Sequence, residues 1–255
     1  MDAGLRDRFG RLWARYFGAA ELPIAFWYSS DQADGERTVP AKGRGCVIAE
    51  VARARRGEKV VLDGGSIACA GGKRYLGFQT QLRPGFEYFL SCGIPGKMEG
   101  ERYKKSPELV REIMKKQVEF KAPGEYAVFK RWDRLGEADE PEVVIFFARP
   151  DVLSGLFTLS GFDEADANAV IAPFGAGCGT IVQYPYLEGK SKHPRAVLGM
   201  FDVSARPCVE ENALTFAAPM AKFERMIENM EVSFLTTGAW AKVRERLISE
   251  DLQPL

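Results

Sequence analysis

Hydrophobic side chains return at helical spacing at both ends of the chain. The first such pattern predicts a helix that ends near Gly18. Its apolar face consists of Leu5, Phe9, Leu12, Trp13, Tyr16 and Phe17. The same spacing predicts two closing helices over residues 223–230 and 240–247, and internal helices at residues 46–56, 106–119 and 151–159. Asp163 is placed to cap one further helical turn.

Short apolar runs between the predicted helices have the composition of β-strands. They cover residues 22–28, 59–62, 126–132, 143–147, 169–172, 196–203 and 213–217. A polar stretch over residues 29–45 predicts a loop, and residues 69–78 predict a short turn of helix. Helices and strands alternate without a regular βαβ rhythm. The pattern therefore predicts an α+β fold with a mixed β-sheet and flanking helices, as a single domain or as two lobes that divide near residues 133–141.

Charge and hydropathy exclude several classes of partner. The 255 residues include 35 basic and 35 acidic side chains, so no net field attracts nucleic acid or a membrane surface. No apolar run approaches the roughly 20 residues that span a bilayer. The chain begins without the basic and then apolar pattern of a secretory signal, so a cytoplasmic location is expected. A small molecule is the expected partner, and the sequence does not decide whether the chain forms a homo-oligomer.

The candidate chemistry of the chain depends on cysteine, because histidine is almost absent. His193 is the single histidine, which excludes a multi-histidine metal site and leaves a histidine-based triad dependent on this residue. An odd number of cysteines without a signal argues against a disulfide framework, and no CxxC pair is present. The five cysteines are Cys46, Cys69, Cys92, Cys178 and Cys208.

Cys178 lies in a glycine-rich turn, residues 173–180, between a predicted strand and a predicted helix start. A dinucleotide fingerprint would need a glycine at Thr180, and a nucleophile elbow would need glycines at Ala176 and Thr180. Neither motif is present. Glycines let a backbone approach a ligand closely, and amides at a helix start favour a thiolate or another anion. The predicted ligand-binding residues of this turn and the helix after it are Gly175, Gly177, Gly179 and Tyr184.

Three hypotheses account for the cysteines that lie beside glycine-rich turns. In the first, Cys46, Cys69 and Cys178 hold an iron–sulfur cluster or a soft metal, or they line a small-molecule site beside a reactive thiol. In the second, Cys178 is a catalytic nucleophile without metal, assisted by Tyr184, Glu188 or His193. In the third, the cysteines are packing residues of a binding or structural protein, which is the expected role of Cys208.

The motifs around these cysteines resemble those of a known family. They are Cys46, Cys69-Ala-Gly-Gly72 with Gly77-Phe78, and Gly177-Cys178 followed by Pro185. In these features the chain resembles the domain-of-unknown-function family 169, also called the archaeal cysteine-rich or ArCR family, over roughly residues 5–247. The family name records no known activity, so the resemblance implies no catalytic residue. It does add weight to Cys46, Cys69 and Cys178 as a shared site. A redox role is one that the first hypothesis allows for this site.

Overall fold

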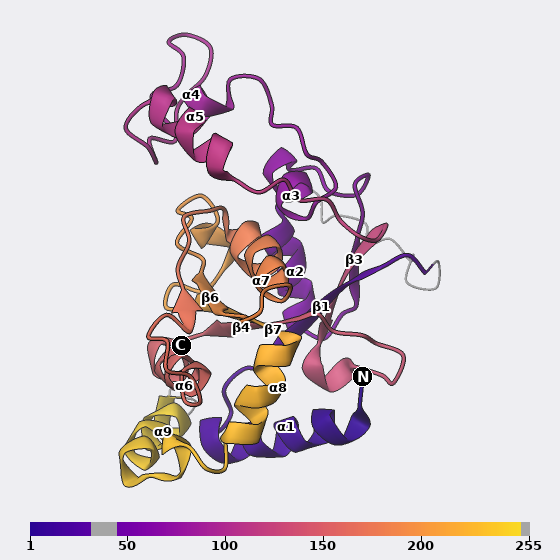
Figure 1. Ribbon diagram of the computed structural model, residues 1–255, viewed down its shortest axis with the longest axis vertical. Helices are drawn as coiled ribbons and strands as arrows, with labels where there is room; N and C mark the ends of the chain where they lie inside the picture. Colours follow the sequence, from indigo (N-terminus) through magenta and orange to yellow (C-terminus); the bar gives the residue numbers. More distant parts are fainter. Residues whose placement is uncertain (32–44, 251–255) are drawn as a thin grey trace.

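The computed structural model describes residues 1–31 and 45–250, and this part of the chain is built on one mixed β-sheet (Figure 1). The strand order is β2-β3-β1-β4-β7-β6-β5, and every neighbouring pair is antiparallel except β5 and β6. The strands are β1 (Ile24–Ser29), β2 (Val60–Leu62), β3 (Tyr126–Arg131), β4 (Val143–Ala148), β5 (Val170–Ile171), β6 (Ala196–Gly199) and β7 (Leu214–Pro219). The predicted α+β fold with a mixed sheet is confirmed.

Helices cover both faces of this sheet. The longer ones are α1 (Ala3–Phe17), α2 (Val47–Arg55), α5 (Pro107–Lys116), α6 (Pro150–Ser160), α8 (Met220–Asn229) and α9 (Gly238–Glu250). The shorter ones are α3 (Ala70–Tyr75), α4 (Phe86–Phe89) and α7 (Tyr184–Glu188). Figure 1 shows α1, α8 and α9 below the sheet, α2, α3 and α7 above it, and α4 and α5 farther out beyond α3. None of the helices in residues 1–31 and 45–250 is long and apolar enough to cross a bilayer.

Side chains of β4 alternate between two hydrophobic cores, as the two-residue period of a strand requires. Val144 and Phe146 enter the first core, on the side of α1, α6, α8 and α9. Val143 and Ile145 enter the second core, on the side of α2 and α3. The first core is rich in aromatic rings, and it contains Trp13, Trp27, Trp132 and Trp240. The candidate site described below lies on the side of the second core.

Local sequence explains where several helices begin. Asp2 caps α1 by accepting a hydrogen bond from the Gly4 amide at 2.7 Å. Ser106 caps α5 in the same way, with Pro107 at the first helical position, where its missing N–H costs nothing. The helices predicted from apolar spacing at residues 46–56, 106–119 and 151–159 are confirmed as α2, α5 and α6.

Several predicted boundaries are wrong for local reasons. The strand expected over residues 196–203 ends at Gly199, because Met200 takes a left-handed conformation with φ of 68° and turns the chain. Asp163 caps no helix, since residues 161–163 form a turn. The short helix α4 was not predicted. Most of the loop expected over residues 29–45 lies outside the described residues.

The connection over residues 133–141, where two lobes were considered, joins β3 to β4. Both of these strands are hydrogen-bonded to β1, so the sheet continues across the connection. At its start Trp132 is buried in the first core and its indole N–H donates to the Arg6 carbonyl at 3.2 Å.

Candidate small-molecule site

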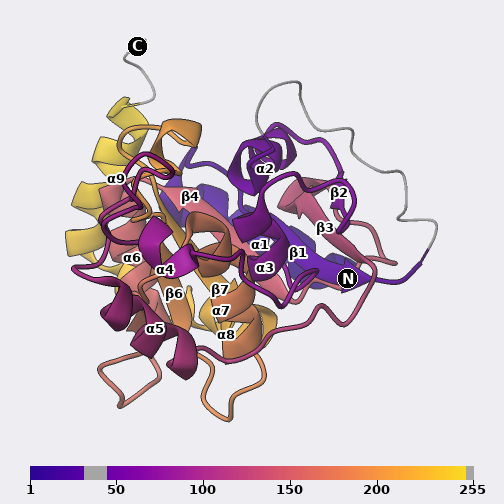
Figure 2. The same cartoon turned by 90° about the horizontal axis from the view of Figure 1, so that it is seen from above.

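A cavity of about 360 Å³ lies on the side of the second core. Figure 2 views this side of the sheet from above, with α2, α3 and α4 in front of the strands. The inner wall of the cavity comes from the starts of α2 and α3 and from the loops over residues 173–180 and 201–205. Its outer wall is the segment over residues 79–103, which contains α4. Small-molecule sites commonly have this volume and a mainly apolar lining. The aromatic residues of the lining are Tyr75, Phe86, Phe89, Tyr103, Phe174 and Phe201.

Glycines bring the starts of α2 and α3 into contact. The Cys69 amide donates to the Gly45 carbonyl at 3.2 Å. A Cβ atom at Gly45 would lie 2.2 Å from the Ala68 Cβ, and one at Gly72 would lie 2.7 Å from Val47 Cγ2. No larger residue fits at either position without moving its neighbour. Cys46 and Cys69, which precede the two helices, therefore lie on the same wall of the cavity.

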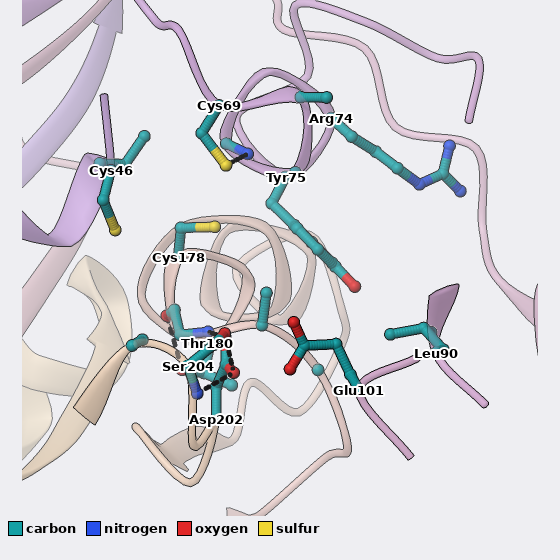
Figure 3. Close-up of a pocket in the computed structure, with 18 of the residues that line it drawn as sticks. Cys46, Cys69, Arg74, Tyr75, Leu90, Glu101, Cys178, Thr180, Asp202 and Ser204 are labelled. Carbon is teal, nitrogen blue, oxygen red and sulfur yellow. Dashed lines mark hydrogen bonds between the residues drawn. The ribbon is translucent and has the colours of Figure 1, made fainter. Parts of the chain in front are cut away.

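Cys178 reaches this wall from a third element. A continuous helical run over residues 177–188 contains one π-helical turn, Gly179–Gln183, before α7. Turns of π-helix are rare in proteins, and those that occur often lie at functional sites. A Cβ at Gly179 would lie 2.5 Å from the Tyr75 ring, so the run packs directly against α3. Figure 3 shows Cys46, Cys69 and Cys178 gathered along one side of the cavity, which all three line.

Burial controls the chemistry of these thiols. Cys178 is only 8% exposed, and this burial raises the pKa of its thiol, with smaller contributions from the neighbouring Cys69, Cys46 and Asp202. Burial also raises the pKa of Cys46. Cys178 is therefore a protonated thiol at neutral pH. This is the opposite of the depressed pKa that the nucleophile hypothesis predicts for the resting thiol, and a catalytic role of Cys178 stays a prediction.

A carboxylate of the protein occupies the start of the helical run, where an anionic ligand was expected. Asp202 accepts a hydrogen bond from the Gly177 amide at 3.1 Å. It also accepts from the Ser204 amide at 3.1 Å, the Ser204 hydroxyl at 2.8 Å and the Tyr103 hydroxyl at 3.3 Å. The carboxylate of Asp202 thus compensates the partial positive charge at the start of this helical run. Contrary to expectation, the Gly177 amide is therefore bonded to Asp202 and not available to a ligand anion.

The other residues predicted for the site divide into two groups. Gly175 and Gly177 line the cavity, but Gly179 instead packs on Tyr75. Tyr184 lies behind the turn, where its hydroxyl donates to the Phe174 carbonyl at 3.1 Å. Tyr184, like the two remaining candidate assistants, does not line the cavity.

The two remaining candidate assistants of Cys178 are engaged or distant. Glu188 forms an ion pair with Arg195 at 2.6 Å. His193 is exposed in the turn that follows α7. Neither is among the residues that line the cavity, so within the described residues the structure brings no acid–base partner from this part of the chain to Cys178.

No pattern in the sequence predicts the outer wall. Its backbone is held by hydrogen bonds from Glu101 to Phe89 at 2.7 Å and from Lys104 to Leu90 at 3.0 Å. The guanidinium of Arg83 lies 4.8 Å from the Phe89 ring centroid. The only sequence signal was the Phe86–Phe89 spacing of one helical turn, which is too short to predict a helix.

Two polar groups face the cavity across from the thiols. Figure 3 shows the Glu101 carboxylate and the Tyr75 hydroxyl directed into the same space. The Glu101 carboxylate makes no hydrogen bond or ion pair with any of the described residues. By contrast, the Arg74 guanidinium is held by the Thr80 carbonyl and the Gln117 side chain. Glu101 is therefore the carboxylate of this wall that is available to a ligand.

The arrangement gives no separate support for a bound metal. Among residues 1–31 and 45–250, no group of three or more histidine, cysteine, aspartate or glutamate side chains is placed to hold a metal ion. All five cysteines and the single histidine belong to this part of the chain. The prediction of an iron–sulfur cluster or a soft metal at Cys46, Cys69 and Cys178 thus depends on residue types alone.

Comparison with known proteins gives one match. Residues 14–229 match the family described as uncharacterised ArCR, the domain-of-unknown-function family 169. No curated protein and no solved structure matches the chain. The resemblance seen in the cysteine motifs is confirmed, and it covers the sheet and the whole lining of the cavity.

Proposed function

The chain belongs to the uncharacterised ArCR family, and we propose that it binds a small molecule with an apolar, ring-containing body and a hydrogen-bond donor. The observation that carries this proposal is the cavity of about 360 Å³ with its aromatic lining. Aromatic side chains favour offset or edge-to-face contacts with a ring of the ligand. Glu101 accepts the hydrogen bond from the donor group of the ligand.

Exposure of aromatic side chains at the cavity supports the ligand class. Phe174 and Phe201 are 48% and 55% exposed, although both line the cavity. A ligand that covers them removes apolar surface from water at about 25 cal/mol per Å². The Lys104 ammonium lies 3.7 Å from the centroid of the Phe174 ring, a cation–π contact at the cavity wall. The thiols of the inner wall provide a soft, weakly polar surface for the same ligand.

Ligand binding is tested by native mass spectrometry of the purified protein and by thermal shift with a panel of aromatic amines and alcohols. We expect Phe174→Ala to weaken binding of a ligand so identified by about tenfold, as expected for loss of one ring contact. Phe162→Ala is the matched control, because Phe162 is 45% exposed but lies away from the cavity. Equal effects of the two substitutions would contradict the proposal.

The role of Glu101 is tested with the same ligands. Glu101→Gln keeps the shape of the side chain and removes its charge, so a ligand with an amine should lose more affinity than one with a hydroxyl. Glu99→Gln is the control, since Glu99 is exposed and does not line the cavity.

A metal centre is the competing outcome of these measurements. Anaerobically purified protein that contains near-stoichiometric iron or zinc, lost in Cys178→Ser, would replace the small-molecule proposal with the metal hypothesis. Metal-free protein with a retained organic ligand supports the proposal as stated.

A further inference from the structure

The cysteines beside the cavity form two neighbouring pairs. Cys69 and Cys178 both line the cavity, and Cys69 is the neighbouring thiol that contributes most to the raised pKa of Cys178. Cys46 instead lies near Cys208, which contributes to the raised pKa of Cys46 and does not line the cavity. Figure 3 shows the sulfur of Cys178 beside that of Cys69. We propose that Cys69 and Cys178 are a redox-active pair that closes to a reversible disulfide across the cavity wall by exchange with a low-molecular-weight disulfide.

The two thiols differ in access, which sets the order of the exchange. Cys69 is exposed at the start of α3, and its sulfur accepts a hydrogen bond from the Gly72 amide at 3.4 Å. Thiol–disulfide exchange requires access of the small disulfide to the attacking sulfur, and the exposed Cys69 provides it. Cys178 is buried one layer below. An incoming disulfide therefore meets Cys69 first, and Cys178 is placed to resolve the intermediate.

The reaction balances as two successive thiol–disulfide exchanges. The Cys69 thiolate attacks one sulfur of the small disulfide, RSSR, forming a mixed disulfide and releasing RS⁻, which takes up the proton that Cys69 gave to solvent. Cys178 then loses its proton and attacks the Cys69 sulfur, and the second RS⁻ leaves as RSH. The protein dithiol is oxidised by two electrons and RSSR is reduced to two RSH.

Contacts of the helical run support this closure. Gly179 lies against the Tyr75 ring, so the helical run that carries Cys178 and the helix α3 are already in contact before any bond forms. Cys69 belongs to the same short helix start as Gly72, which packs on Val47. A disulfide here would join two elements that are far apart in sequence but already packed together, which limits the backbone movement that its formation requires.

The test uses the full chain and oxidised glutathione in anaerobic buffer, and it does not depend on any cavity ligand. We expect the free thiols to fall from five to three per chain, and peptide mapping to find a Cys69–Cys178 crosslink that dithiothreitol reverses. In Cys178→Ser, glutathione should remain attached to Cys69. In Cys69→Ser, Cys178 should stay free, and Cys92→Ser should behave as the unchanged chain.

Three outcomes would overturn the inference. They are a Cys46–Cys208 crosslink in place of the expected one, no crosslink at all, and a Cys69–Cys178 crosslink that forms only in denaturant. Cys178→Ala replaces Cys178→Ser if the serine variant does not fold, as judged by circular dichroism. Because the readout is a covalent bond, failure of this inference and failure of the small-molecule proposal are distinguishable.

Discussion

At the scale of single residues, Gly179 sets the distance between α3 and the helix that carries Cys178. Its missing side chain leaves room for the ring of Tyr75, which is itself only 9% exposed. Alanine is the better helix former in isolation. The packing on Tyr75 overrides that preference, since a largely buried ring has little room to move away from a new methyl group.

We therefore expect Gly179→Ala to lower the free energy of unfolding by about 1–3 kcal/mol. The matched control is Gly10→Ala in α1, where an added Cβ meets nothing within 4 Å. That substitution should raise the free energy of unfolding by about 0.5–1 kcal/mol. Urea denaturation followed by circular dichroism measures both, and a stabilising effect at Gly179 would show that the contact with Tyr75 is not limiting.

Burial of Cys178 also predicts how stability changes with pH. Its pKa is raised in the folded state, whereas an unfolded cysteine titrates near ~8.5. Above that pH the unfolded chain releases a proton that the folded chain keeps, so the contribution of this thiol is complete at lower pH and is lost as pH rises.

We expect Cys178→Ala to fall less steeply in stability between about pH 8.5 and 9.5 than the unchanged chain. Iodoacetamide should label the exposed Cys69 and Cys92 in the folded state and Cys178 only on unfolding. Rapid labelling of Cys178 in the folded protein at neutral pH would instead support the nucleophile hypothesis.

At the scale of elements, one arginine links the end of α2 to the segments that precede β1 and β7. Arg55, at the last turn of α2, pairs with Glu21 before β1 at 2.6 Å and with Glu210 before β7 at 2.8 Å. Its guanidinium also lies 4.5 Å from the Phe147 ring centroid. Burial acts against ionisation of Glu210, but the hydrogen bonds from Arg55 outweigh it and lower the pKa of that carboxyl.

Arg55→Gln should lower the free energy of unfolding at pH 7 by about 1–2 kcal/mol, because the glutamates are partly exposed and screened. A lowered folded pKa contributes stability above the unfolded value near ~4.3, and this contribution is lost as pH falls. The difference between variant and unchanged chain should therefore shrink below about pH 4. Arg56→Gln, at an exposed neighbour, should stay within about 0.5 kcal/mol at either pH.

Elements with a sustained hydrophobic pattern could be predicted from the sequence. Elements that depend on tertiary contacts could not. The period of Leu5, Phe9 and Leu12 specifies α1, and the continuous apolar run over residues 143–147 specifies the central strand β4. The helix α4 has four residues and is held by its neighbours, so no period could reveal it. In the site, the glycine-flanked cysteines could be recognised in the sequence, whereas the outer wall could not. The Asp202 contact depends on the chain folding back over the 25 residues between Gly177 and Asp202.

At the scale of the whole molecule, the shared sheet lets the two cores be observed separately. The chain has four tryptophans, and all of them lie in the first core. Cys178 lies in the second core, on the opposite face of the sheet. Tryptophan fluorescence thus reports one face, and protection of the Cys178 thiol reports the other.

We expect the two probes to give the same midpoint in guanidinium, because both cores pack on one sheet and loss of that sheet would expose them together. Phe223→Ala, in the first core, should shift both midpoints together, with a cost of about 3–5 kcal/mol. Two separate midpoints, with only the fluorescence transition shifted, would instead support a division into two lobes.

The outer wall of the cavity has a consequence for how binding properties can diverge within the fold. Residues 89–104 are closed largely by backbone hydrogen bonds among themselves, including the paired bonds between Ile94 and Met98. Hydrogen bonds between backbone groups do not depend directly on the identity of the side chains of those residues. Replacements at Phe86 or Leu90 can therefore reshape the cavity while the sheet and both cores keep their packing. We therefore expect this wall to tolerate library selection for new ligands on an unchanged scaffold.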